Sequence, residues 1–175
     1  SAALTDLVGV LQPRGMLSAL QLEVASISGP FAQWQLLAAF DDLAVEPWHG
    51  APGISGADGF VRLAPGSGSV VLDSRQFSMF FPTVHRRARE YDDVLGTPNV
   101  GGDAESVVLS SGLLQARGEE GPVRVLFGLS IPLHASEVGL EMDLLVGLEN
   151  TRAIHRGKYI PYILSQKLRP WLAAS

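Results

Sequence analysis

The sequence predicts a mostly β protein built on a mostly antiparallel sheet with some long strands and a helix near the C-terminal end. Three observations predict it. Apolar and polar residues alternate through most of the chain, which is typical of strands with one apolar face. Turn residues separate these runs at intervals of about 10–18 residues, and helical spacing is found only near the end.

The first third of the chain predicts two strands, each with one apolar side. The apolar positions of the first strand are Leu20, Leu22 and Val24. The second strand spans residues 33–45, and its apolar side carries Leu36, Ala38 and Phe40. These residues define one face of a sheet.

Short strands follow in the middle of the chain. Residues 60–63 and 70–72 flank a Pro-Gly-Ser-Gly turn, a good hairpin signal. Residues 107–109 and 113–116 follow a pair of glycines. The glycine-rich stretch at 53–59 is interpreted as a turn between strands rather than a phosphate cradle, because glycine is the default residue of tight turns.

The clearest alternation comes in two runs that together predict a long hairpin. The apolar positions of the first run are Val123, Val125, Phe127, Leu129, Ile131 and Leu133. Those of the second run are Leu140, Met142, Leu144, Val146 and Leu148. Residues 136–139 supply the turn, and each strand would reach roughly 30–35 Å. Leu145 lies between two of these positions and predicts that part of the outer face is also covered.

Helical spacing is found at residues 160–173, with Pro161 in the first turn and Pro170 near the end. The charged stretch at 86–93 is compatible with a short helix or a loop, since its periodicity does not decide between them. No flexible linker is visible, so residues 1–175 are interpreted as one module.

Composition excludes several classes of protein. The net charge of −5 argues against a nucleic-acid surface, and the absence of cysteine excludes disulfides and thiolate metal sites. Nowhere do about 18 apolar residues run together, so no transmembrane helix is predicted. The N-terminal residues do not have the pattern of a signal peptide.

No constellation of catalytic residues is visible. The nucleophile-elbow, Walker and dinucleotide-binding motifs are absent. The four histidines lack metal-ligand spacing, so a metal site would require tertiary assembly and surface or turn positions are the simpler interpretation. The acidic pairs at 41–42, 92–93 and 119–120 are interpreted as solvated turns. The sequence therefore predicts no enzyme and no metal.

Two basic clusters stand out against this background. Their cationic residues are Arg86, Arg87 and Arg89 in the first cluster and Arg152, Arg156 and Lys158 in the second. They could be solvated loops. They could also contact anionic lipid head groups or an acidic protein partner, at about 1 kcal/mol per residue near an anionic surface.

Three stretches in order resemble motifs of the AsmA-like family, YhdP type. They are residues 13–17 (PRGML), residues 45–53 (VEPWHGAPG) with the glycines that follow, and residues 158–161 (KYIP) with 168–172 (LRPWL). Residues 80–86 (FFPTVHR) fall where the family has a proline-phenylalanine-arginine stretch. The charged residues 87–93 depart from the short apolar strand that follows there in the family.

The resemblance implies a function without covalent chemistry or a cofactor. AsmA-like proteins are similar to bridge-like lipid transfer proteins, which form long curled sheets with an apolar trough. The YhdP type is linked to phospholipid movement toward the outer membrane of Gram-negative cells and to its permeability barrier. The resemblance thus implies a periplasmic segment of a much larger protein anchored in the inner membrane, with phospholipid as its partner.

The alternating residues would then form a lipid groove. Its floor would be Leu20, Leu22, Val24, Leu36, Phe40, Val123, Val125, Phe127, Leu129, Ile131, Leu140, Met142, Leu144, Val146 and Leu148. The same residues could instead form a closed core. The alternative function is a structural or assembly module of the cell envelope, which holds a protein partner by a sheet edge or a basic loop.

Overall fold

All the strands that the computed structural model describes belong to one antiparallel sheet. It describes residues 12–26, 33–48, 50–82, 85–102, 105–119, 121–132 and 141–148, and no helix lies among them. The strands are β1 (Arg14–Ser26), β2 (Gln33–Val45), β3 (Gly53–Ala64), β4 (Ser67–Phe80), β5 (Arg89–Gly96), β6 (Pro98–Gly102), β7 (Ser106–Ser111), β8 (Leu114–Gly118), β9 (Gly121–Pro132) and β10 (Glu141–Leu148). The prediction of a mostly β protein with one long antiparallel sheet is confirmed.

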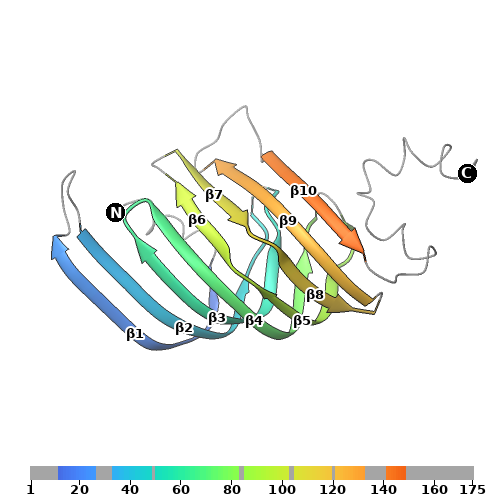
Figure 1. The fold of residues 1–175 in the computed structure, drawn as a ribbon, viewed down its shortest axis with the longest axis horizontal. Helices are drawn as coiled ribbons and strands as arrows, with labels where there is room; N and C mark the ends of the chain where they lie inside the picture. The colour runs from blue at the N-terminus through green and yellow to red at the C-terminus, as the bar shows by residue number, and fades with distance from the viewer. Residues whose placement is uncertain are drawn as a thin grey trace, which may run out of the picture.

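The chain runs up and down the sheet, and each crossing of the sheet is called a rung. Two of the rungs consist of two strands separated by a short break. Strand β4 pairs first with β6 and then with β5 in one unbroken register, so β5 and β6 form a single rung. Strands β7 and β8 likewise share one edge of β9, whose other edge pairs with β10. Neighbouring rungs are therefore always neighbours in sequence, which makes the sheet a continuous meander (Figure 1).

A bulge separates β7 from β8. Pro98 pairs with Ser111 on one side of it and Leu95 with Gln115 on the other, so residues 112–114 lie opposite residues 96 and 97. The backbone N–H of Phe127 donates to the Ser111 hydroxyl oxygen at 2.8 Å, which satisfies a donor beside the bulge.

Further bulges bend the first four rungs. Ala19, Asp42 and Gln76 have left-handed backbone angles (φ 47°, 50° and 59°), and the register shifts close to each of them in the pairings of β1 with β2, β2 with β3 and β3 with β4. Bulges increase the local bend and twist of a strand. Figure 1 shows β1 to β4 turning upward at the bottom of the view, so the sheet curls into a trough.

Polar groups follow this line of bulges across the sheet. The Asp42 backbone N–H donates to a carboxylate oxygen of Asp58 at 2.9 Å, and the Asp58 N–H donates to the Ser74 hydroxyl at 2.9 Å. The Ser74 hydroxyl donates in turn to the Asp58 carbonyl at 3.2 Å. These bonds satisfy backbone groups at positions where the ladder is irregular.

Four predictions on local structure are wrong. Residues 53–59 are not a turn but the first half of β3, and most of the charged stretch 86–93 lies in β5, which pairs with β4 and β8. The acidic pairs 41–42 and 92–93 lie within strands rather than in turns. Leu145 is 66% exposed, so the prediction that its outer position is covered is wrong. The helix predicted at 160–173 and the turn at 136–139 lie outside the described residues.

Candidate functional site

The concave face of the trough is the candidate site, and its two edges are named here by the strand ends that form them. The first rim carries the ends of β2, β4 and β8 and the starts of β3 and β5. The second rim carries the ends of β3, β6 and β9 and the starts of β4 and β7. Each rung crosses the trough from one rim to the other, because neighbouring rungs are antiparallel.

The two long C-terminal strands place their alternating apolar residues on this face. The cross-strand partners are Leu129 and Met142, Phe127 and Leu144, and Val125 and Val146. Val123 is 1% exposed, Leu129 and Ile131 are buried, and Leu144 is the most exposed of the set at 43%. Leu140 lies outside the described residues, and the backbone of Leu148 pairs with Val123.

The bend of the trough is filled by the protein's own side chains. Phe40, Ala57, Phe77 and Val94 are buried together, although they come from four different strands. Tyr91 packs against this cluster, and its ring is tilted against that of Phe77 at a centroid distance of 6.4 Å. Phe40, predicted in the groove, is thus part of a closed core, whereas Leu36 is half-buried.

The β1 end of the concave face is exposed. Leu20, Leu22 and Val24 are 63%, 60% and 50% exposed, and Leu17 on the same face is equally open. Val24 pairs with Trp34 and Leu22 with Leu36 on β2, while no described strand pairs with the other edge of β1. We call Leu17, Leu20, Leu22 and Val24 with Trp34 and Leu36 the open shelf.

A turn from the first rim closes the opposite part of the trough. The Ala51 backbone N–H donates to the Trp48 carbonyl at 2.7 Å, and Gly50 between them has a left-handed φ of 91°. Gly53 must be small here, because a Cβ would lie 2.6 Å from the Pro47 ring. The hydrogen bond and the close approach of Gly53 to Pro47 keep this connection compact.

Ala51 and Phe81 of the first rim are buried against Leu129 and Ile131 near the second rim. Trp48, Leu109, Phe127 and Met142 pack around this contact. We call Trp48, Ala51 and Phe81 the clasp, since they join the two rims over the concave face. In Figure 1 the start of β3 lies behind β8 and β9, in agreement with this contact.

The sequence analysis missed Leu17 and the clasp. Leu17 is out of phase with Leu20 because the Ala19 bulge lies between them, so strict alternation could not find it. The clasp contact spans about half the chain, and no local pattern encodes it. The Pro-Trp turn flanked by apolar residues was its one signal in the sequence.

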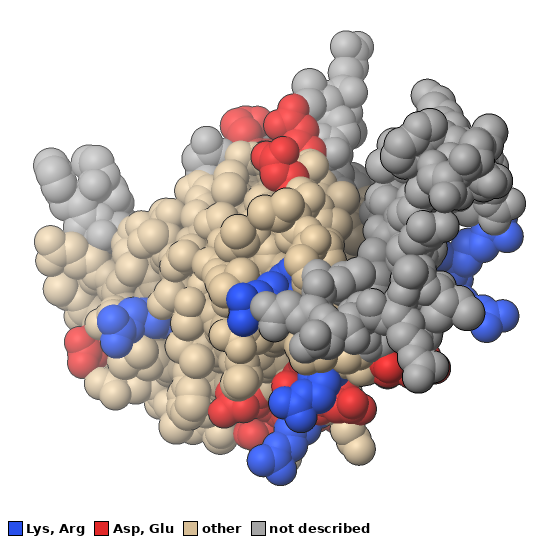
Figure 2. Space-filling model, turned by 45° about the vertical axis from the view of Figure 1, so that its right-hand side comes forward, with Lys and Arg blue, Asp and Glu red and all other residues tan. Residues whose placement is uncertain are grey.

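Charged groups lie mainly at the edges of the view in Figure 2, and much of the described surface between them carries no Lys, Arg, Asp or Glu. Arg86 and Arg87 are exposed in the connection before β5, and Arg89 is half-buried at its start. Burial and, to a smaller extent, the Arg89 charge hold the pKa of His85 below its ordinary value of 6.5. Arg152, Arg156 and Lys158 lie outside the described residues.

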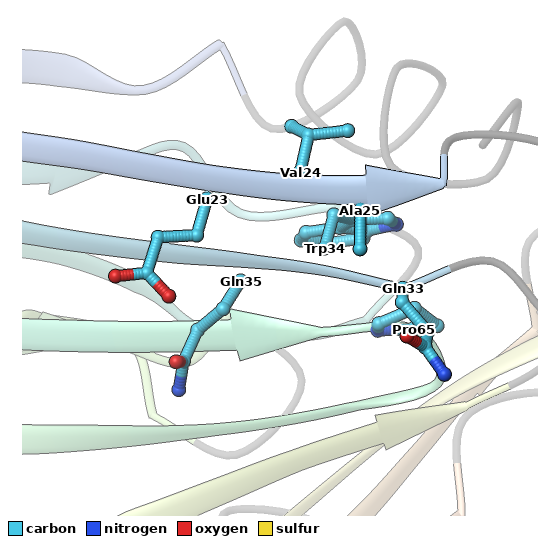
Figure 3. Close-up of a pocket in the computed structure, with 7 residues that line it drawn as sticks. All are labelled: Glu23, Val24, Ala25, Gln33, Trp34, Gln35 and Pro65. Atoms are coloured by element: carbon cyan, nitrogen blue, oxygen red, sulfur yellow. The ribbon is translucent and has the colours of Figure 1, made fainter.

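A shallow, wide-open depression of about 580 Å³ lies at the hairpin end of β1 and β2 (Figure 3). Its lining residues are Glu23, Val24, Ala25, Gln33, Trp34, Gln35 and Pro65. Figure 3 shows the Glu23 and Gln35 side chains on the side opposite to Val24, as expected for neighbours of alternating direction. The depression therefore borders the open shelf with polar groups.

The described side chains on the concave face offer mainly apolar contact. Among the described residues, no group of three or more His, Asp or Glu side chains could hold a metal ion. The carboxylate of Asp58 already accepts a hydrogen bond from the backbone of Asp42 within the sheet. In the same part of the chain, no helix is long and apolar enough to cross a membrane.

A comparison with protein families decides the assignment. The family model described as YhdP protein matches residues 1–175, the whole of this chain. The chain belongs to the YhdP family. Comparisons with curated proteins and with solved structures give no match. Membership in the YhdP family agrees with the three sequence motifs and suggests an envelope protein related to lipid transport.

Proposed function

We propose that this chain is a non-catalytic lipid-transfer module whose concave face receives the acyl chains of phospholipids. In this proposal it lies in the periplasm, as part of a longer protein anchored in the inner membrane, and it carries phospholipid between inner and outer membrane. That movement supports the permeability barrier of the outer membrane. The row of exposed aliphatic side chains on the β1 part of the concave face carries the proposal.

The energetics of that row favour an apolar ligand. Leu17, Leu20, Leu22 and Val24 lie on one face of one strand and are each at least half exposed. Covering apolar surface with an acyl chain gains about 0.8 kcal/mol for each methylene removed from water. An acyl chain forms no hydrogen bonds, so it needs only apolar surface.

Family membership supports the same conclusion. YhdP-type proteins are a non-catalytic lipid-transport family as a rule. The meander also suits a conduit, because stacking of rungs along one axis lengthens the apolar face without changing its chemistry.

The test is mass spectrometry of organic extracts from the purified chain and from two variants. Leu22→Asp places a charge on the open shelf, and Gln21→Asp places the same charge on the opposite face of the same strand. We expect phospholipid to be enriched with the unmodified chain and with Gln21→Asp, and to be lost with Leu22→Asp. A clean extract from the unmodified chain, or equal lipid in both variants, would contradict the proposal.

The assembly module remains the second candidate, supported by the exposed Arg86 and Arg87 on the first rim. In that case an acidic envelope protein would bind this connection. Replacement of both arginines by glutamine should then weaken cross-linking to that partner in the envelope and leave lipid content unchanged. Unchanged cross-linking would exclude the candidate.

A further inference from the structure

We propose that a second copy of this chain binds the convex face of the sheet, which is the face opposite the trough. The two copies would be related by a twofold axis that runs parallel to the strands. The proposal concerns a different face from the proposed lipid site and does not depend on it. It rests on the exposed apolar residues of the convex face and on the charges beside them.

Six successive rungs each contribute one exposed residue to a straight row across the convex face. We call it the convex row, and its members are Phe60, Val71, Thr97, Leu113, Leu126 and Leu145. Phe60 pairs directly with Val71, and Leu126 pairs directly with Leu145. The unbroken register of β4 places Thr97 opposite Val71, and Leu113 lies in the bulge between Thr97 and Leu126.

The neighbours of the convex row show that it faces away from the trough. Val61 packs against the buried cluster of the bend, so Phe60 beside it points outward. Leu144 lies on the concave face, so Leu145 beside it also points outward. The five apolar members are between 38% and 66% exposed. A continuous apolar surface of this kind marks an interaction site.

The convex row is complementary to itself about a twofold axis. An axis between the rung of β5 and β6 and the rung of β7 and β8 brings β3 of one copy over β10 of the other, and β4 over β9 (Figure 1). The contacts across this axis are Phe60 with Leu145, Val71 with Leu126, and Thr97 with Leu113. Each contact contains an apolar side chain and no charge, which is the self-complementary pattern that a twofold dimer requires.

The charged residues beside the convex row follow the same symmetry. Arg62 on β3 and Asp143 on β10 are exposed, and each lies two residues from the row toward the second rim. Asp73 on β4 and Arg124 on β9 are also exposed, and each lies two residues from the row toward the first rim. The axis therefore places Arg62 over Asp143 and Asp73 over Arg124 of the second copy. Opposite charges meet at four places in such a dimer, which favours a second copy over a partner without this pattern.

The surface next to the convex row allows two sheets to approach closely. The uncharged residues beside it toward the second rim are Ser69, Asn99, Ser110 and Gly128. The row spans about 24 Å at the usual spacing of strands, and a band of about four residues on each side covers roughly 650 Å² of each copy. A standard interface buries about 800 Å² per partner, so we expect a reversible dimer that depends on concentration.

The test is sedimentation velocity of the unmodified chain at increasing concentration, together with two aspartate variants. Leu145→Asp places a charge in the convex row, whereas Leu20→Asp places the same charge on the concave face at a leucine of similar exposure, 63% against 66%. We expect the unmodified chain and Leu20→Asp to dimerise equally. Leu145→Asp should dimerise at least about tenfold more weakly, because each dimer would bury the added carboxylate twice.

Charge reversal tests the orientation of the two copies. Arg62→Glu and Asp143→Arg should each weaken the dimer, because each variant places like charges across the axis. The chain that carries both substitutions should dimerise as the unmodified chain does. Four rungs separate β3 from β10 in one chain, so this rescue requires a contact between two copies.

Circular dichroism establishes that each variant keeps its sheet. A chain that stays monomeric at every concentration, or that forms assemblies larger than a dimer, would overturn the proposal. So would a dimer that Leu145→Asp leaves intact or that Leu20→Asp dissociates, because its contact would lie elsewhere. A double charge reversal that restores nothing would exclude the twofold arrangement. None of these results bears on the lipid content that tests the proposed function.

Discussion

Strands β1 and β9 carry the same alternating apolar pattern, yet the concave residues of β1 are exposed and those of β9 are buried or half-buried. Leu22 of β1 is 60% exposed and Val123 of β9 is 1% exposed. Strand β9 is paired along both edges, and its Leu129 and Ile131 are buried against the clasp, whereas β1 is paired along one edge among the described strands. Alternation thus fixes the face to which a side chain points, and tertiary contacts decide whether that face is filled.

The largest predicted effect comes from placing a charge at each end of the concave face. Val123→Asp buries a carboxylate without a partner, which should cost more than about 3 kcal/mol and abolish cooperative folding. Leu22→Asp leaves its carboxylate in water and should change stability by less than about 1 kcal/mol. Urea unfolding followed by circular dichroism measures both. Similar losses in the two variants would contradict the contrast between the ends.

A glycine comparison tests how tightly the bend is packed. A Cβ on Gly59 would lie 1.9 Å from the Val71 carbonyl oxygen, and its φ is +154°, so Gly59→Ala should lose about 2–3 kcal/mol. At Gly128 the nearest heavy atom is 4.0 Å away, and the same substitution should cost almost nothing. Thermal unfolding of both variants provides the measurement. A stable Gly59→Ala chain would mean that the bend is looser than described.

A smaller effect is expected from the polar bonds that hold the bulges. Ser74→Ala removes the hydroxyl that bonds both backbone groups of Asp58 and should lose about 1–2 kcal/mol. Ser78→Ala removes only an exposed bond to Glu90 and should stay within about 0.5 kcal/mol. Equal urea midpoints for the two variants would show that the bulges do not depend on Ser74.

The smallest effect concerns pH at the first rim. Burial and Arg89 lower the pKa of His85 in the folded chain, so protonation favours the unfolded chain. The contribution of His85 to stability is therefore complete above its ordinary pKa of 6.5 and declines as the pH falls through and below that value. His85→Gln should reduce the loss of stability between about pH 7.5 and about pH 5.5. An unchanged pH dependence in this variant would argue against a buried His85.

The sequence predicted the faces of β9 and β10 correctly, because both strands are regular and their alternation is uninterrupted. It failed where the backbone leaves regular geometry. Gly56 and Gly59 were interpreted as turn residues, but their positive φ values serve a bulged strand in close contact with β4. The bulge at Gln76 likewise shifts the phase of alternation within β4. Glutamine is not a residue type that indicates a bulge, so the sequence contains no sign of this shift.

The charged strand β5 was missed for another reason. Its sequence is rich in charged residues and lacks a regular apolar alternation. It becomes a strand because β4 and β8 supply backbone hydrogen bonds on both of its edges. Among its charged side chains, Glu90 and Asp92 are exposed, and Asp93 lies 3.6 Å from Arg117 on β8. Such tertiary support overrides local preference and cannot be found from a single stretch of sequence.

Hydrogen–deuterium exchange with and without bound phospholipid tests the central contrast most directly. If acyl chains bind the exposed β1 end of the concave face, amide exchange in Arg14–Ser26 and Gln33–Val45 should slow when lipid binds, and exchange in Gly121–Pro132 should stay slow and unchanged. Lipid that leaves β1 and β2 unprotected, or that speeds exchange in β9 by opening the clasp, would contradict the account.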